Sequence, residues 1–399
     1  MNTAARAMIA AALATAIAAC GGDDASGDGD DVSSTGTGGS SATQTGASVS
    51  VDDGGSADGN GTGDGPGTGD GPGTASADGS GSADSGDPDT GGNGMVPPTL
   101  CGSTPPDGAE LAPPLPAYSG GECMPVAPGV NAITSAGNER SFILVVPSDL
   151  HDDEVLPVLF LWHWLQGAPE DFLEKALVQE AVDQFRFAAV VPYEKGDLFF
   201  NWPYSAIDSD ARMQEEFVFF DDMLACVAAS YPVDDNCVGS AGVSSGALWT
   251  SQLGSGRGEH LSTIMVMSGG TGGLVKPWNG SPHIMPAMVL WGGDTDTCVA
   301  INFTMTSHDL EMGLVEDGHA ILECVHNCGH TEPPFEAPPG ITKFAFLWEF
   351  FLDHPYWLED GESPWNAALP EGAIEWCAMG AGAATPRVGE CDDGGDCAL

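Results

Sequence analysis

The sequence predicts an α/β fold with a mostly parallel central sheet flanked by helices. Short apolar runs, several of them rich in β-branched residues, alternate along the chain with longer amphipathic runs. Several of the short runs contain no polar residue, which is typical of strands buried on both faces of a sheet. Alternating strands and helices imply βαβ units with right-handed crossovers. A ligand site is therefore expected beyond the carboxyl ends of the strands.

The expected elements lie between residues 141 and 352. Strands are expected at residues 141–147, 155–162, 187–192, 237–243, 262–268, 287–291 and 320–326. Helices are expected at residues 169–185, 213–230, 245–254, 299–314 and 341–352. Beyond them, residues 357–399 are rich in Gly and Ala and contain three cysteines, and we expect them to form a C-terminal tail.

The first nineteen residues are typical of an export signal. They contain one early charge, Arg6, then an apolar run too short for a comfortable membrane span, and they end in two alanines before Cys20. This ending resembles the lipobox of bacterial lipoproteins. The resemblance implies that Cys20 is diacylated and anchors the chain to a membrane of the cell envelope, on its outer surface. The alternative is an ordinary signal peptide followed by an unrelated cysteine.

Residues 20–98 are expected to form a disordered acidic linker. They are almost entirely Gly, Ser, Thr, Asp and Ala and contain no aromatic residue. Such a segment cannot bury enough apolar surface to offset the entropy of ordering. Residues 99–356 remain for one folded domain with a substantial core.

The charge balance argues against nucleic acid as a partner. The chain has 58 acidic and 10 basic side chains, whereas phosphate neutralisation needs clustered Lys and Arg. The acidic excess is either an adaptation to salty surroundings or a bias that aids solubility, and we favour the second interpretation.

The cysteines favour disulfides in an exported protein. Ten remain when Cys20 is set aside, and an even number in an oxidising compartment is typical of disulfide pairing. Spacing does not determine which cysteines pair. We expect the local pairs Cys101–Cys123, Cys226–Cys237 and Cys391–Cys397, and a bridge from Cys298 to Cys324 or Cys328. No C-x-x-C motif is present, and the acidic run at 392–396 has no known calcium-loop spacing, so no metal site is expected.

A candidate nucleophile lies in the segment Gly242-Val-Ser-Ser-Gly246. This G-x-S-x-G pattern stands where an expected strand meets an expected helix. Its glycines allow a sharp turn and close packing, and the turn exposes the hydroxyl of Ser244 on a strained bend. Because the chain has 56 glycines, the pattern alone is a weak signal.

An acid and a base follow the candidate nucleophile in the chain. Asp294 and Asp296 come after the strand at 287–291, and His326 and His330 end or follow the strand at 320–326. His330 is favoured over His326 because it lies past the strand. The order nucleophile, acid, base is the one expected of an α/β-hydrolase. In that arrangement the histidine takes the serine proton, and the carboxylate fixes its tautomer.

Residues 140–356 resemble the esterase family that includes poly(3-hydroxybutyrate) depolymerases, feruloyl esterases and acetylxylan esterases. The matching segments are Arg140–Pro147, Leu161–His163 with Gly167–Phe172, Tyr231–Asp235 leading into Gly242–Gly246, Asp296–Val299 and Cys328–Thr331. The match of Thr-Cys-Val after Asp296 favours this residue over Asp294. The resemblance covers more than half of the chain.

The resemblance implies a serine esterase that needs no cofactor and acts on polymer-linked esters, either polyhydroxyalkanoate or feruloyl and acetyl groups on polysaccharide. Its oxyanion hole would use the backbone N–H groups of Ser245 and Trp164. His163, Trp202 and Trp249 are candidate substrate-binding residues, since aromatic rings suit an aromatic acyl group or a sugar. The alternatives for His163 and Trp249 are a buried histidine and core packing.

Three departures from the family pattern concern the substrate. Trp164 replaces the glycine of a His-Gly pair, and a bulky indole there would narrow the acyl site. The acid loop lacks the family's histidine, and residues 332–334 lack the tryptophan expected after the catalytic histidine. Two alternative functions stay open: a serine peptidase of the same fold, and a non-catalytic binding lipoprotein on a degenerate hydrolase fold.

Overall fold

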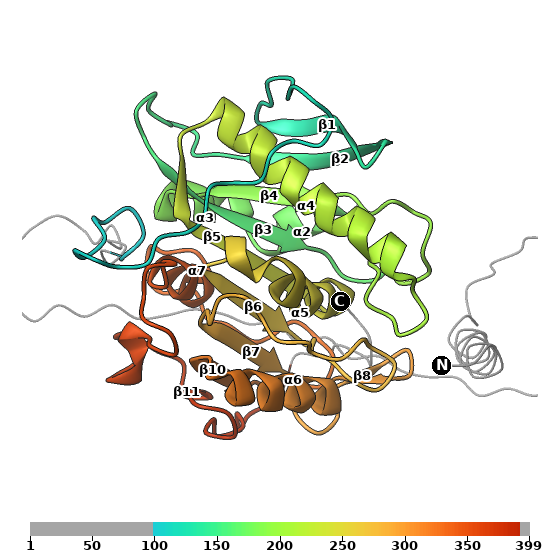
Figure 1. The fold of residues 1–399 in the computed structure, drawn as a ribbon. Helices are drawn as coiled ribbons and strands as arrows, with labels where there is room; N and C mark the ends of the chain where they lie inside the picture. The colour runs from blue at the N-terminus through green and yellow to red at the C-terminus, as the bar shows by residue number, and fades with distance from the viewer. Residues whose placement is uncertain (1–98, 392–399) are drawn as a thin grey trace, which may run out of the picture. The chain divides into compact units, whose positions relative to one another are not determined.

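The computed structural model describes residues 99–391, which are built around a nine-stranded sheet (Figure 1). The strand order is β1-β2-β4-β3-β5-β6-β7-β10-β11. The strands are β1 Gly129–Ser135, β2 Asn138–Val145, β3 Leu156–Trp162, β4 Ala188–Pro192, β5 Val233–Val243, β6 Thr263–Met267, β7 Ala287–Trp291, β10 Ile321–Val325 and β11 Cys377–Met379. A separate two-stranded ribbon consists of β8 Thr297–Cys298 and β9 Ile301–Asn302.

The sheet is mostly parallel, as the sequence predicts. Six adjacent strands from β4 to β10 run parallel, while β1, β2 and β11 pair antiparallel at the two edges. The chain passes from β3 to β4 on one side and then returns to β5 on the other side of β3. Such a reversal of strand order leaves a crevice beyond the carboxyl ends of the strands. This architecture is the α/β-hydrolase fold.

Helices cover both faces of the sheet (Figure 1). Helices α4 Asp210–Ser230, α5 Ser245–Arg257 and α6 Phe303–Asp317 pack on one face, and α2 Pro169–Lys175, α3 Val178–Phe185 and α7 Ala345–Leu352 on the other. Successive side chains of β3 point to opposite faces of the sheet. Phe160 and Trp162 therefore belong to the core cluster on one face, and Leu159 and Leu161 to the cluster on the other. All seven residues of β3 are buried.

The structure differs from the expected elements at several places. The helix expected at 299–314 begins at Phe303, after the ribbon of β8 and β9. The expected helix at 169–185 is divided into α2 and α3, because Leu177 adopts a left-handed conformation with φ 50°. Strand β1 was not expected, and its alternating exposure is that of an edge strand with one solvated face. Strand β11 was not expected either, and it belongs to the segment that the sequence analysis set apart as a tail.

The disulfide pairs expected from sequence proximity are wrong. The structure pairs Cys101 with Cys237, Cys123 with Cys226, Cys324 with Cys377 and Cys328 with Cys391. Cys298 is also disulfide-bonded, and its expected partners Cys324 and Cys328 are both engaged elsewhere. Each observed bridge joins segments that are adjacent in space and at least 53 residues apart in the chain. The fold therefore determines which cysteines pair, and their separation in the sequence does not.

The expected signal peptide at 1–19, the lipidation site Cys20, the linker at 20–98 and Cys397 lie outside the described residues. Within residues 99–391, no helix has both the length and the apolar character needed to cross a membrane.

Candidate active site

The segment Gly242–Gly246 forms a sharp turn between β5 and α5. Ser244 lies at the turn with φ 54° and ψ −116°, a conformation that costs an L-residue about 1–3 kcal/mol. A Cβ atom on Gly246 would lie 2.0 Å from the carbonyl oxygen of Trp162, and one on Gly242 would lie 2.3 Å from the backbone of Gly246. Both positions therefore require glycine, and the strained turn that the sequence predicts is confirmed.

Three side chains that are distant in the sequence meet beyond the carboxyl ends of the strands. Nε2 of His330 lies 2.9 Å from Oγ of Ser244, and its Nδ1 lies 2.7 Å from Oδ1 of Asp296. Ser244 follows β5, Asp296 lies in the loop after β7, and His330 lies in the loop after β10. All three are buried. The structure thus brings together the hydroxyl, imidazole and carboxylate that the sequence analysis selected.

Two further donors hold the carboxylate of Asp296. Its Oδ2 accepts hydrogen bonds from Oγ of Ser268 at 2.8 Å and from the backbone N–H of Gly292 at 2.7 Å. Because both donors engage Oδ2, Oδ1 is left to face His330. Hydrogen bonds to a charged acceptor are strong and fix its orientation. The sequence analysis missed Ser268, since a serine after a strand carries no signal beyond that of an ordinary turn residue.

The ring of Phe303 covers one face of the His330 imidazole. The ring centroids are 4.2 Å apart and the planes are inclined by 18°. Phe303 is the first residue of α6, and its N–H donates to the carbonyl of Asp296 at 2.8 Å. This contact restricts rotation of the imidazole and keeps water from that face. The sequence analysis did not identify Phe303.

The competing acid and base do not join this arrangement. Asp294 is exposed, whereas Asp296 is completely buried. His326 is buried without a hydrogen-bond partner at either ring nitrogen, and burial lowers its pKa to about 4. The geometry therefore selects Asp296 and His330, as the sequence analysis favoured.

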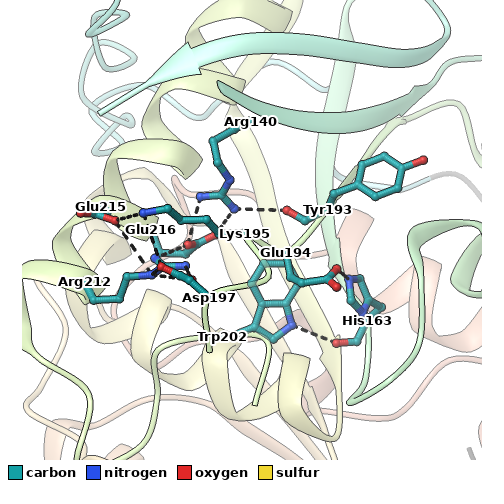
Figure 2. A network of polar contacts seen from close by, with 10 residues as sticks. All are labelled: Arg140, His163, Tyr193, Glu194, Lys195, Asp197, Trp202, Arg212, Glu215 and Glu216. Carbon is teal, nitrogen blue, oxygen red and sulfur yellow. Dashed lines mark hydrogen bonds and ion pairs between the residues drawn. The ribbon is translucent and has the colours of Figure 1, made fainter. Parts of the chain in front are cut away.

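The backbone at residues 163 and 164, directly after β3, is fixed by side chains from another loop. Nε1 of Trp202 donates to the carbonyl of His163 at 3.0 Å (Figure 2). Because a trans peptide is planar, with C=O and N–H on opposite sides, the N–H of Trp164 points away from this indole. The carbonyl of Trp164 accepts hydrogen bonds from Nδ2 of Asn201 and from the N–H of Gly167, both at 3.1 Å.

His163 is buried and holds this loop through its imidazole. Nδ1 lies 3.0 Å from the carbonyl oxygen of Trp164, and Nε2 lies 3.2 Å from Oε2 of Glu194 (Figure 2). Both ring nitrogens therefore face oxygen atoms of the surrounding loops. The interaction with His163 holds the pKa of Glu194 below its usual value. With no exposed surface, His163 is a positioning residue, and its expected contact with substrate is corrected.

A network of ion pairs anchors the loop after β4 (Figure 2). Arg140 of β2 and Arg212 of α4 both bind the buried carboxylate of Glu216, each at 2.6 Å. Arg212 also pairs with Asp197 at 3.0 Å, and Nη2 of Arg140 donates to the carbonyl of Tyr193 at 3.2 Å. Since the whole chain has only ten basic residues, the use of two of them on one buried carboxylate indicates a structural role for this network.

The indoles of Trp202 and Trp249 are wholly buried, and the expectation that they contact substrate is wrong. Trp202 packs edge-on against Trp162 with centroids 5.0 Å apart. Trp249 lies on the inward face of α5, 5.1 Å from the ring of Phe217 and 6.0 Å from that of Trp162. Core packing, the alternative considered for Trp249, describes it correctly.

An apolar pocket borders the segment that holds the nucleophile. Its lining includes Val243, which precedes Ser244, and Met267, whose carbonyl accepts the N–H of Ser244 at 2.9 Å. The indole of Trp164 forms another wall, together with Phe172, Phe344, Leu347 and Trp348. The cavity volume is about 60 Å³, and the charged members of its lining are Lys175 and Glu332. Of the tryptophans that the sequence analysis named, Trp164 lines this pocket, whereas Trp202 and Trp249 do not.

Comparisons with known proteins find similar solved structures at low sequence identity. The crystal structure of native sOPH is 18% identical, with a TM-score of 0.48 over 66% of this chain and 97% of that chain. An acetyl xylan esterase from Aspergillus awamori is 17% identical, with a TM-score of 0.38 over 47% of this chain and 80% of that chain. A ferulic acid esterase is 18% identical, with a TM-score of 0.30 over 35% and 59%.

No protein-family model and no curated protein matches this chain. The similar structures include an acetyl xylan esterase and a ferulic acid esterase, two classes that the sequence resemblance names. We assign the fold from the strand order of this chain and its chemistry from its own side-chain geometry.

Proposed function

We propose that this protein is a serine hydrolase that cleaves carboxylic esters through an acyl-serine intermediate. The hydrogen-bonded series of Ser244, His330 and Asp296, at 2.9 and 2.7 Å, is the observation that supports it most strongly. Nε2 of His330 takes the hydroxyl proton as Oγ attacks the ester carbonyl, and then gives that proton to the leaving alcohol. A water activated by the same imidazole releases the acid. Asp296 holds the tautomer and stabilises the imidazolium.

We assign the oxyanion hole to the backbone N–H groups of Ser245 and Trp164. Ser245 begins α5, where the first N–H groups have no intrahelical partner and the helix dipole favours negative charge. A Cβ atom on Gly246 would lie 2.8 Å from the carbonyl oxygen of His163, so the start of α5 touches the loop that contains Trp164. Two converging N–H donors would stabilise the tetrahedral intermediate.

The apolar pocket is the proposed acyl site, and it favours a short acyl group. A cavity of about 60 Å³ holds roughly four to six water-sized groups. An acetyl or 3-hydroxybutyryl group fits this size better than a feruloyl group or a long acyl chain. The indole of Trp164 lines this pocket, and a glycine at that position would leave its space open, which supports a short acyl group.

The sequence of the N-terminal segment supports action on a polymer at the cell surface. A lipid anchor at Cys20 followed by a linker at 20–98 would let the domain reach an insoluble substrate while it stays attached to the membrane. The proposed substrate is therefore an ester within or on a polymer, such as a polyhydroxyalkanoate or acetylated polysaccharide.

A fluorophosphonate probe and an ester panel test this function. We expect the probe to label the wild-type protein and not Ser244→Ala, and we expect p-nitrophenyl acetate and butyrate to be hydrolysed faster than the octanoate and methyl ferulate. Hydrolysis of peptides in preference to esters would favour a peptidase. Absence of labelling in the folded wild type would favour a non-catalytic binding protein.

A further inference from the structure

Three metal-ligating side chains meet where α6 packs on the sheet. His308 and Glu311 lie three residues apart on α6, a spacing that places them on one face of the helix. Glu323 lies in the middle of β10. Each of the three offers one ligand atom, and these atoms all lie within 4.8 Å of one another. None of the three belongs to the proposed catalytic series.

The two carboxylates of this cluster are buried without a compensating cation. Glu311 is 4% exposed and Glu323 is 2% exposed. Among residues 99–391, neither forms an ion pair with Lys, Arg or His. Two unpaired carboxylates in an apolar interior are costly unless a proton or a cation neutralises them.

Glu311 is the most informative member, because its carboxylate lacks a partner. Its Oε1 is buried and has no hydrogen-bond partner. Glu323 differs, since its Oε2 accepts a hydrogen bond from the backbone N–H of Ala384 at 2.8 Å. Glu311 thus offers a buried, unpartnered oxygen beside an imidazole and a second carboxylate, and a bound cation would satisfy it.

We propose that His308, Glu311 and Glu323 bind a divalent transition metal, with Zn²⁺ as the best fit, and that this ion clamps α6 to β10. One imidazole and two carboxylates suit Zn²⁺, whereas Ca²⁺ prefers six to eight oxygen ligands. Tetrahedral ligands at about 2.0–2.2 Å from the ion lie about 3.4 Å apart. Side-chain rotations that bring the three atoms together by about 1–1.5 Å would complete the site, and water would fill the fourth position.

The surroundings give the ion access and a structural role. His308 is exposed, and its ring packs edge-on against Trp291 with centroids 4.8 Å apart. An ion can therefore enter from solvent on the His308 side and meet the buried carboxylates behind it. Helix α6 begins at Phe303, which stacks on His330, so a clamp on α6 would also stabilise the helix that supports the active site.

To test the proposal, metal is removed from the full chain with a chelator, and Zn²⁺ is then added. We expect about one Zn²⁺ per chain by equilibrium dialysis and elemental analysis, and a rise in Tm that reverses on chelation. Co²⁺ should give visible absorption bands that report a low-coordinate site. His308→Ala removes an exposed ligand, so the fold should persist while Zn²⁺ affinity falls at least about tenfold. Glu311→Gln should have the same effect on affinity.

The matched control is Glu316→Gln, which makes the same charge change at an exposed position of the same helix. It should bind Zn²⁺ like the wild type. If the wild type shows no stoichiometric Zn²⁺ and no change in Tm, the carboxylates are neutralised by a proton and the proposal is wrong. If His308→Ala and Glu311→Gln bind Zn²⁺ as tightly as Glu316→Gln, the ion lies elsewhere and the assigned ligands are wrong.

Discussion

Oγ of Ser268 donates to Oδ2 of Asp296 at 2.8 Å, from the end of a strand that carries neither the nucleophile nor the base. Gly292 donates to the same oxygen at 2.7 Å. The two donors come from the ends of β6 and β7, so the carboxylate is held between neighbouring strands. Rotation of this carboxylate would break two hydrogen bonds, and His330 therefore meets an acid with a fixed orientation.

The substitution Ser268→Ala should weaken catalysis without unfolding the protein. It removes one of two donors to Oδ2, and a hydrogen bond to a charged group contributes about 1.5–3 kcal/mol. We expect kcat/KM for a p-nitrophenyl ester to fall by about one to two orders of magnitude. Ser262→Ala is the control, because that buried hydroxyl donates to the carbonyl of Val238, away from the site. Equal activity of the two variants would show that Ser268 does not position the acid.

Trp202→Phe should lower kcat more than it changes KM. The substitution keeps a buried ring and removes the donor to the carbonyl of His163, so the peptide that presents the N–H of Trp164 is free to rotate. An oxyanion donor acts mainly in the transition state. We expect kcat to fall about tenfold in steady-state ester hydrolysis. Trp249→Phe is the matched control, because its buried Nε1 has no hydrogen-bond partner. If both variants lose the same activity, the effect is one of packing alone.

The sequence predicted the mostly parallel sheet and the three side chains of the proposed catalytic series, because both features leave signals in short segments of the chain. Buried strands appear as apolar runs, and Ser244, Asp296 and His330 each lie in a short segment just past such a run. The constraint on Gly242 is also local, since a Cβ atom there would meet the backbone of Gly246, four residues further along the chain. These features depend on residues that are close together in the chain.

The remaining features depend on which segments meet in space. Trp202 and Trp249 are aromatic residues near loops, and only the packed structure shows that their rings point into the core. The bridge between Cys101 and Cys237 spans 136 residues and needs the fold before its partners are known. Ser268 likewise gains its role only because β6 and β7 are neighbours in the sheet.

Arg140→Met should reduce stability strongly. The guanidinium of Arg140 is buried, binds Glu216 at 2.6 Å and lies 3.8 Å from the centre of the Phe219 ring. Its loss leaves a buried carboxylate with one cation fewer, which costs about 3 kcal/mol in the free energy of unfolding. Denaturant unfolding with disulfides intact measures the change. The control is Arg186→Met, a partly exposed ion-pair residue whose loss should cost at most about 1 kcal/mol. Similar losses for both variants would contradict a structural role for the network.

His326→Leu should make the protein less sensitive to acid. Burial lowers the pKa of His326 to about 4, below the value of about 6.5 in the unfolded chain. Above pH 6.5 the imidazole is neutral in both states and has no effect on the pH dependence. Between pH 6.5 and 4 only the unfolded state takes up the proton, so stability falls as the pH drops, by up to about 2 kcal/mol at pH 5.

The leucine side chain binds no proton and is close to histidine in volume. We expect the loss of unfolding free energy between pH 7 and pH 5 to be smaller in the variant by about that amount, as measured by urea unfolding at each pH. Identical losses in variant and wild type would mean that the buried imidazole binds its proton equally well in the folded state.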